Sequence, residues 1–306
     1  MVTIKDLEIE FNKHDLEHNY TSFSEKDQNF DNEFLDDLIK LENKSILGID
    51  IYQYSKFKEP GQNFNPVIFK LILNITNQNI VKYDYFLFQK YIKNSTLQLD
   101  FIDSGDGGFF IFDNPLLSLA YAIHFQEVLT NYNTYHLYRK FRMNVGEISL
   151  RYSITYDSIF KLDDNYYGPA IINNARILSQ DKLNRCLFDQ NTHDWFLKYF
   201  NSIEQLSYIT DKDLNRIEVF KDYDYSKVLG IKHSVLSKNG QDGVQTYGIK
   251  SIYSQKIGTI KSKSQYLSIY NLQISFIYSI VDEENEKYQN ITSTLGNLNT
   301  SGIIVE

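Results

Sequence analysis

The chain has 306 residues and a formal net charge of −8, and its composition is 42% hydrophobic and 15% aromatic with a single Cys. This content of apolar side chains excludes a disordered chain, and one Cys excludes an internal disulfide. The acidic balance argues against a nucleic-acid partner, and no apolar run reaches the roughly 18 residues that a membrane helix needs. We therefore expect a cytoplasmic protein that binds neither nucleic acid nor membrane.

The first part of the chain, residues 1–44, is charged and rich in Asn. Apolar residues recur at helical spacing over Asn32–Leu41, which predicts a helix there. The run Ser45–Ile51 is continuously apolar apart from Asp50, a pattern typical of a buried strand. We expect this strand to begin the main folded unit.

Periodicity predicts the elements that follow this strand. In chain order they are a helix from Pro66 toward Tyr91, a β-hairpin of Leu97–Ile102 and Gly108–Phe112, a helix over Leu116–Tyr138, strands at Ile148–Ile154 and Ser158–Leu162, a helix from Gly168 to Leu178, and a strand at Arg185–Phe188. The order β-α-β-β-α-β is the ferredoxin-like arrangement, so the predicted fold class is α+β.

The hydrophobic pattern of the sequence changes from about Asp211. Helical periodicity fades, Leu267–Tyr270 and Leu272–Phe276 alternate in the manner of half-buried strands, and Gly302–Val305 is typical of a closing strand. We predict three units, namely an N-terminal helical segment (1–44), an α+β domain (45–205) and a β-rich domain (210–306).

Two short segments carry aspartates beside β-favouring runs. Asp50 closes the first strand, and Asp106 lies in the Gly-flanked turn of the hairpin together with Asp103. Such residues can meet at one edge of a sheet, where two carboxylates repel each other unless divalent cations lie between them. The pattern therefore predicts a Mg²⁺ or Mn²⁺ site for a phosphate-bearing substrate. The alternative is that Asp103 and Asp106 are ordinary turn residues.

A third segment, Asn165–Ile177, contains a Gly-Pro pair at a helix start and ends in Ala-Arg-Ile. With Asp50, the Tyr54-Ser55 pair and the Gly-Asp turn, it resembles the class III nucleotide cyclases over residues 45–190. That family has an Asp on its first strand, an aromatic-Ser pair just after it, a Gly-Asp hairpin turn, and a Gly-opened helix that ends in Ala-Arg.

The resemblance implies roles for these residues. Asp50 and Asp106, with the backbone carbonyl of Ile51, would bind two Mg²⁺ or Mn²⁺ ions, and the segment Tyr52–Ser55 would meet the triphosphate. Arg176 would stabilise the charge on the pentavalent phosphorus. In this family one subunit of a dimer supplies the Asp pair and the other the Arg, so the resemblance implies a homodimer with active sites at its interface.

The chain departs from the family pattern at the positions that recognise the base of the nucleotide. Purine cyclases of this class have a Lys before the Gly-Asp turn and an Asp or Cys before the Gly of the third segment, where this chain has Ile102 and Asn165. A pocket built for hydrogen bonds rejects a base that leaves its groups unpaired, so these departures favour a pyrimidine.

The pattern is similar to that of the pyrimidine cyclases of the bacterial Pycsar anti-phage system. Those proteins have an Arg-Tyr pair followed by a second Arg; here Arg151-Tyr152 match and Lys161 is near the later place. The family Asn four residues before the Arg is replaced by Ile172, with Asn173 and Asn174 next to it. Residues 210–306 are similar to the AGS-C domain, a proposed sensor, in their position in the chain and in their strand-like sequence pattern.

The resulting hypothesis is a cytidylate cyclase that makes cyclic CMP from CTP as a second messenger in anti-phage defence, acting on a cyclic-nucleotide-responsive effector protein. Asn165 can donate and accept hydrogen bonds, so it favours CTP only slightly, and a uridylate cyclase that makes cyclic UMP is the first alternative. A catalytically inactive cyclase-like module that binds nucleotide or senses a phage component is the second.

Overall fold

The computed structural model describes residues 5, 41–57, 59, 61–134, 139–163, 165–228, 234–236, 240–241, 244–245, 247–262, 265–282, 287–301 and 303. The helix predicted over Asn32–Leu41 lies outside these residues, except for Leu41, which is not helical. Within this part of the chain, no helix is both long and apolar enough to cross a bilayer.

Four strands form the centre of the main sheet: β1 (Glu42–Ile51), β4 (Asp100–Asp103), β5 (Gly107–Phe112) and β6 (Leu150–Leu162). They are antiparallel and lie in the order β6-β1-β5-β4. Helix α3 (Gly61–Tyr83) connects β1 to β4 by way of the hairpin of β2 (Ile92–Lys93) and β3 (Thr96–Leu97), and α4 (Pro115–Thr134) precedes α5 (Arg139–Val145) and β6. This order and pairing confirm the predicted α+β class and βαββαβ arrangement.

The remaining elements complete the chain. They are η1 (Tyr54–Lys56), η2 (Gln89–Tyr91), β2 (Ile92–Lys93), β3 (Thr96–Leu97), α5 (Arg139–Val145), β7 (Asn165–Tyr167), α6 (Pro169–Gln180), β8 (Cys186–Asp189), α7 (Gln190–Phe200), η4 (Ile203–Ser207), η5 (Asp211–Arg216), η6 (Glu218–Phe220), η7 (Tyr225–Val228), β9 (Gly240–Gln241), β10 (Val244–Gln245), β11 (Gly248–Ser262), β12 (Gln265–Asp282) and β13 (Lys287–Leu295), where η marks a 3-10 helix.

Several details of the predicted elements were wrong. The strands predicted at Ile148–Ile154 and Ser158–Leu162 are one strand, β6, because residues 155–157 between them pair with Lys44, Ser45 and Ile46 of β1. Helices α5 and α7 were not predicted at all.

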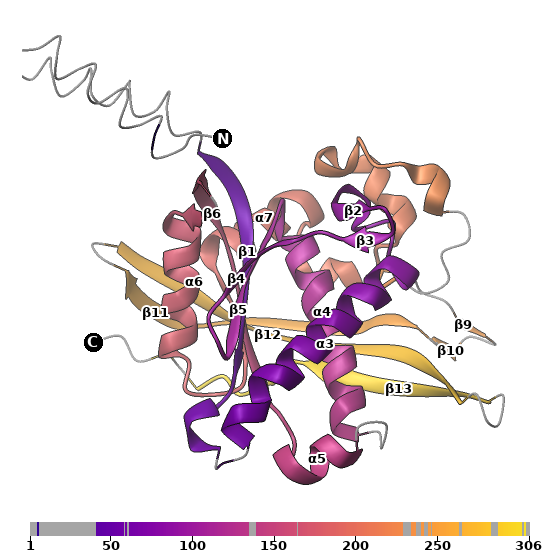
Figure 1. Cartoon of the computed structure of the whole chain (residues 1–306). Coiled ribbons are helices and arrows are strands. Elements are labelled where there is room, and N and C mark those ends of the chain that lie inside the picture. The colour runs from indigo at the N-terminus through magenta and orange to yellow at the C-terminus, as the bar shows by residue number, and fades with distance from the viewer. Residues whose placement is uncertain are drawn as a thin grey trace, which may run out of the picture.

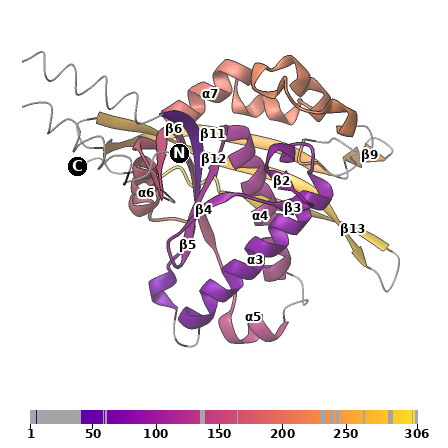
Figure 2. The ribbon, with the colours of Figure 1, turned by 45° about the horizontal axis from the view of Figure 1, so that its top comes forward.

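The helices cover both faces of the sheet. Figure 1 shows α6 on one side of the central strands and α3 and α4 on the other, and Figure 2 shows α7 along the top. Leu47 and Ile49 of β1 belong to the large core under α3 and α4, whereas Ile46 packs in a small apolar cluster with Ala170 of α6. Because side chains alternate along a strand, Asp50 shares the α6 face with Ile46.

Gly48 allows α6 to lie close to β1. A Cβ atom at this position would lie 2.1 Å from Asn174 Oδ1 and 2.8 Å from Leu178 Cδ1, both on α6. A larger side chain here would have to displace these two side chains, so Gly48 allows the close approach of α6 to the strand that carries Asp50.

The C-terminal strands continue the main sheet. Strand β12 pairs antiparallel with β8, from Ile269 opposite Asp189 to Leu272 opposite Cys186, and also pairs with β11 and β13. The two segments predicted as alternating strands both lie in β12. Of the predicted closing strand Gly302–Val305, only Ile303 is described, and it is not in a strand. The division into domains stays a prediction.

Pro66 lies inside α3, which begins earlier than predicted, at Gly61, and ends at Tyr83, short of the predicted Tyr91. Residues 89–91 instead form the 3-10 helix η2. A proline has no N–H, so the carbonyl of Gln62, four residues before it, has no helical donor. The hydroxyl of Tyr54 donates to this carbonyl over 2.8 Å. The contact holds the turn that follows β1 against the start of α3.

A buried polar cluster joins α4 to the end of α3. His124 Nε2 lies 3.0 Å from Asp84 Oδ2, and His124 Nδ1 lies 3.6 Å from Glu127 Oε2. The N–H of Val235 donates to the same Asp84 oxygen over 3.2 Å, and Asp211 lies close enough for the Asp84 charge to raise its pKa. Burial alone would lower the pKa of His124, but its hydrogen bond to Asp84 and the charges of Asp84 and Glu127 raise it to about 9.

We expect this cluster to make stability depend on pH above neutrality. The folded chain holds the His124 proton more tightly than the unfolded chain, whose His pKa is 6.5, so the stabilisation is complete below that value and is lost as the pH rises through about 9. Thermal unfolding followed from about pH 7.5 to 9.5 should show this loss in the wild-type protein and much less of it in His124→Gln. Parallel curves for the two proteins would contradict the assignment.

Candidate functional site

A cavity of about 500 Å³ lies at the end of β1, beside the β4–β5 turn and the last residues of α6. Its lining consists of Asp50, Ile51, Tyr52, Gln53, Tyr54, Ser55, Lys56, Asp106, Arg151, Ser179, Asp181 and Lys182. We call it the carboxylate cavity. Six of the residues selected from the sequence meet here: Asp50, Ile51, Tyr54, Ser55, Asp106 and Arg151.

The β4–β5 turn places Asp106 in this cavity. Gly105 has a φ of 95°, which favours glycine, and its N–H donates to Asp103 Oδ1 over 2.8 Å. The N–H of Ile51 donates to the backbone carbonyl of Asp106 over 3.2 Å, which ties the turn to the end of β1. Asp103 acts as a turn residue and also pairs with Lys70 at 3.3 Å, whereas Asp106 lines the cavity.

The charge of Asp50 is set by burial and two neighbours. Burial raises its pKa, the guanidinium of Arg151 opposes that rise, and the charge of Asp106 adds to it. Arg151 Nε donates to Asp50 Oδ2 over 2.5 Å, and Arg151 Nη1 donates to the carbonyl of Asp181 over 2.8 Å. The two carboxylates are therefore close enough to repel each other, and Arg151 holds one of them in place.

Two lysines that we did not select from the sequence also line the carboxylate cavity. Lys56 ends the 3-10 turn that starts at Tyr54, and Lys182 follows α6. The signal for Lys56 is its position directly after Ser55, but Lys182 is brought in only by the packing of α6 against β1. Together with Arg151 they bring three cationic side chains into a cavity that is also lined by the carboxylates of Asp50, Asp106 and Asp181.

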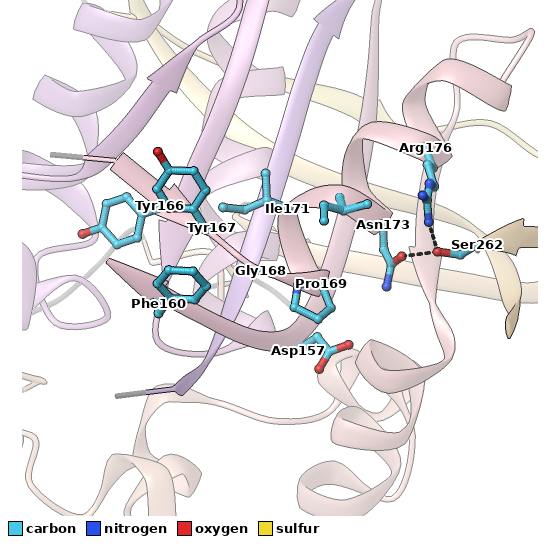
Figure 3. Close-up of a pocket in the computed structure, with 11 residues that line it drawn as sticks. Asp157, Phe160, Tyr166, Tyr167, Gly168, Pro169, Ile171, Asn173, Arg176 and Ser262 are labelled. Atoms are coloured by element: carbon cyan, nitrogen blue, oxygen red, sulfur yellow. Dashed lines mark hydrogen bonds between the residues drawn. The ribbon is translucent and has the colours of Figure 1, made fainter. Parts of the chain in front are cut away.

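Arg176 lies in a different cavity, of about 710 Å³, along the N-terminal part of α6. We call it the arginine cavity; Figure 3 shows its lining, which is Asp157, Phe160, Tyr166, Tyr167, Gly168, Pro169, Ile171, Ile172, Asn173, Arg176 and Ser262. The rings of Phe160 and Tyr167 stack with centroids 5.5 Å apart. Its two large exposed apolar side chains, Tyr167 and Ile172, make this an open, largely apolar face.

Of the residues selected for the base, Ile102, Asn165 and Lys161 line neither cavity, and each lies next to Tyr166, which lines the arginine cavity. Asn165 begins β7 directly before Tyr166, and Ile102 packs in the small apolar cluster that also contacts Tyr166. Lys161 lies 3.5 Å from Asp100 Oδ1 and 4.8 Å from the centre of the Tyr166 ring. Arg151, selected with Lys161, instead lies beside Asp50.

The neighbouring residues Asn173 and Asn174 have different surroundings. Asn174 is fully buried, and its amide donates to the carbonyls of Ile46 and Ser153 over 2.7 and 3.1 Å. It therefore fastens α6 to the sheet. Asn173 lines the arginine cavity and accepts a hydrogen bond from Ser262.

No residue lines both cavities, so Asp50 and Arg176 of one chain do not face a common space. Among the described residues, no group of three or more His, Cys, Asp or Glu side chains is placed to hold a metal ion. Three acidic side chains line the carboxylate cavity, namely Asp50, Asp106 and Asp181, and the Asp181 carboxylate already pairs with Arg185 at 2.8 Å.

Neither a protein-family model nor a curated protein matches the sequence. Among solved structures, the adenylyl cyclase CyaB from P. aeruginosa is similar with a TM-score of 0.43 and 12% identity, over 76% of this chain and 95% of that chain. The guanylyl cyclase Cya2 follows with 0.41 and 12%, over 76% and 93%. An adenylate/guanylate cyclase/hydrolase from Silicibacter pomeroyi gives 0.39 and 14%, over 76% and 97%.

Proposed function

We propose that this chain is a pyrimidine nucleotide cyclase that converts CTP to 3′,5′-cyclic CMP and pyrophosphate. One observation carries the proposal: Asp50 and Asp106, from segments about fifty residues apart, line one cavity with the Tyr54–Ser55 turn and three cationic side chains. Such a cavity has the charges that a metal-bound triphosphate requires.

The carboxylate cavity fits divalent cations. Asp106 raises the pKa of Asp50, so the two carboxylates repel each other, and a cation between them would relieve that repulsion. Mg²⁺ is commonly held by one or two carboxylates together with substrate phosphates and water, so the absence of a third carboxylate ligand among the described residues is no obstacle. Two Mn²⁺ or Mg²⁺ ions, held by Asp50, Asp106 and the carbonyl of Ile51, would activate the ribose 3′-hydroxyl and neutralise phosphate charge.

The protein's own residues position the substrate. Arg151 orients Asp50 and opposes the rise in its pKa that burial causes, and Lys56 and Lys182 supply positive charge for the β- and γ-phosphates. The Tyr54 hydroxyl already donates a hydrogen bond to the carbonyl of Gln62, so Tyr54 contributes by holding the 3-10 turn η1 in place. The first N–H groups of η1 have no hydrogen-bond partner inside the turn itself. The 3′-oxygen then attacks the α-phosphorus in line, and the bond to the bridging oxygen breaks as pyrophosphate leaves.

The proposed active site needs two chains. Arg176 would stabilise the charge that develops on the α-phosphorus, yet it lines a separate cavity in its own chain. A homodimer that sets the arginine cavity of one chain against the carboxylate cavity of the other would complete two equivalent sites. The exposed Tyr167 and Ile172 support this arrangement, because they leave an apolar face at the rim of the arginine cavity.

The direct test is to incubate the purified protein with Mn²⁺ and all four nucleoside triphosphates and to identify the product. Cyclic CMP as the main product supports the proposal, and cyclic UMP supports the uridylate alternative. Cyclic AMP or cyclic GMP as the dominant product would refute the pyrimidine assignment, and no product at all would favour an inactive nucleotide-binding module. A role in anti-phage defence through a downstream effector, and a sensor role for residues 210–306, rest on the sequence resemblance alone.

Asn165→Asp is expected to retain CTP turnover and to penalise UTP. A carboxylate accepts from the cytosine amino group, whereas it faces the O4 acceptor of uracil with a second acceptor, at a cost on the order of 1 to 3 kcal/mol. The measurement is the ratio of kcat/KM for CTP and UTP. Asn144→Asp on α5, an exposed site outside both cavities, makes the same chemical change and should leave the ratio unaltered. An unchanged ratio in Asn165→Asp would remove Asn165 from base recognition.

A further inference from the structure

The C-terminal strand β11 reaches Arg176 through Ser262. Arg176 Nη1 donates to Ser262 Oγ, and Ser262 Oγ donates to Asn173 Oδ1 over 2.7 Å, as the dashed lines in Figure 3 show. Ser262 and Asn173 are each only 8% exposed. The hydroxyl thus links two residues of α6 that are one turn apart and that both line the arginine cavity.

The chemistry of the three groups gives the hydroxyl a role that few side chains can fill. A guanidinium only donates hydrogen bonds and an amide oxygen only accepts them, so the group between them has to accept from one and donate to the other. Ser262 does both. Because Ser262 occupies one lone pair of the Asn173 amide oxygen, Asn173 can offer its NH₂ and the second lone pair to a ligand.

Ser262 holds Arg176 without neutralising it. Within the described part of the chain, no acidic side chain forms an ion pair with Arg176, and its guanidinium donates instead to the neutral hydroxyl of Ser262. A carboxylate in this place would compete with phosphate for the guanidinium. A hydroxyl fixes the direction of the side chain and leaves the positive charge and the other N–H groups available.

Apolar packing places Ser262 beside α6. Ile177, next to Arg176, packs in a cluster with Ile260 and Ile269 of β11 and β12 and with Leu187 of β8. Ile260 and Ser262 lie two residues apart on one strand and so point to the same face. The contact between Ser262 and Arg176 therefore rests on a buried interface between α6 and the C-terminal strands.

We propose that Ser262 is a positioning residue of the active site, through which strand β11 orients Arg176 and Asn173. The inference rests on the proposed cyclase activity and adds to it that the C-terminal region takes part in catalysis. It follows that loss of the hydroxyl should slow the chemical step more than it weakens substrate binding, because Arg176 acts on charge that develops in the transition state.

The test compares Ser262→Ala with Ser254→Ala. Ser254 lies on the same strand and its hydroxyl donates to Glu204 Oε1 over 2.5 Å, so the control loses a hydrogen bond of similar kind away from both cavities. With Mn²⁺ and the triphosphate that the wild-type protein converts, we expect Ser262→Ala to lower kcat by about 10- to 100-fold with a smaller change in KM. Ser254→Ala should stay within about twofold of the wild-type protein, and Ser262→Thr, which keeps the hydroxyl, should recover most of kcat.

The outcomes separate the two proposals. An active wild-type protein with equal kcat in Ser262→Ala and Ser254→Ala overturns the role of Ser262 and leaves the cyclase proposal standing. A wild-type protein without cyclase activity overturns both. If Ser262→Ala unfolds at the assay temperature, Ser262→Thr and Ser262→Cys decide the matter, because both fill the site and only the Thr variant keeps a strong donor; equal kcat in these two overturns the inference.

Discussion

Replacing either Asp50 or Asp106 with Ala is expected to abolish nucleotide cyclisation, with a fall in kcat of about 1000-fold or more. Each substitution removes half of the carboxylate pair that lines the cavity and that would hold the cations. The fold should persist, because burial makes the charged form of Asp50 unfavourable and neither carboxylate belongs to the apolar core.

Asp103→Ala provides the matched control. Asp103 lies in the same turn, three residues before Asp106, but it bonds to Gly105 and Lys70 and does not line the cavity. It should keep most of the activity. Product formation over a range of Mn²⁺ concentrations, with unfolding midpoints for all three variants, is the measurement. Substantial turnover in Asp50→Ala or Asp106→Ala would rule out the two-metal assignment.

Mixing the two inactive variants Asp106→Ala and Arg176→Ala is expected to restore activity. If each active site takes its carboxylates from one chain and its arginine from the other, a mixed dimer has one intact site and one site that lacks both groups. Random exchange makes about half of the dimers mixed, so the recovered activity should approach a quarter of the wild-type value.

The control for this experiment is a mixture of Asp50→Ala with Asp106→Ala. Both substitutions lie in the carboxylate cavity, so every site of a mixed dimer keeps a defective carboxylate pair and no activity should return. Subunit exchange is verified by tagging the two chains differently. If the subunits exchange and the mixture of Asp106→Ala with Arg176→Ala remains inactive, the active site is built within one chain. The location of Asp50 and Arg176 in separate cavities then has another explanation.

The central fold was predictable because its elements carry strong local patterns. The apolar run at Ser45–Ile51 and the long apolar helix α4 each indicate a buried element without reference to the rest of the chain. Helix α7 was missed although its first turn has a signal, since the Asp189 side chain accepts from the N–H of Thr192 over 2.9 Å. The boundary inside β6 was wrong because pairing with β1, which no local pattern records, keeps residues 155–157 extended.

The candidate site was predictable to a similar degree. The apolar run that ends at Asp50 and the Gly-flanked turn that holds Asp106 are both visible in the sequence. They indicate a strand end and a hairpin turn at one edge of the sheet, so Asp50 and Asp106 could be placed together. Lys182 and Ser262 could not be found in this way, because tertiary packing alone brings the end of α6 and the end of β11 to the two cavities. The choice between Asn173 and Asn174 likewise depends on which side of α6 faces the sheet.

The pairing of β12 with β8 limits how the C-terminal region can be studied. Strand β8 has four residues and lies between β6 and β12 in the sheet. A chain that stops before β11 would leave β8 as an open edge, with unpaired backbone groups beside Leu187 and Phe188, which are fully buried in the intact protein. Exposed apolar edges of this kind promote aggregation. A deletion of the chain from β11 onward would therefore not distinguish misassembly from loss of regulation. Single substitutions in β11 avoid this ambiguity when the role of the C-terminal region is tested.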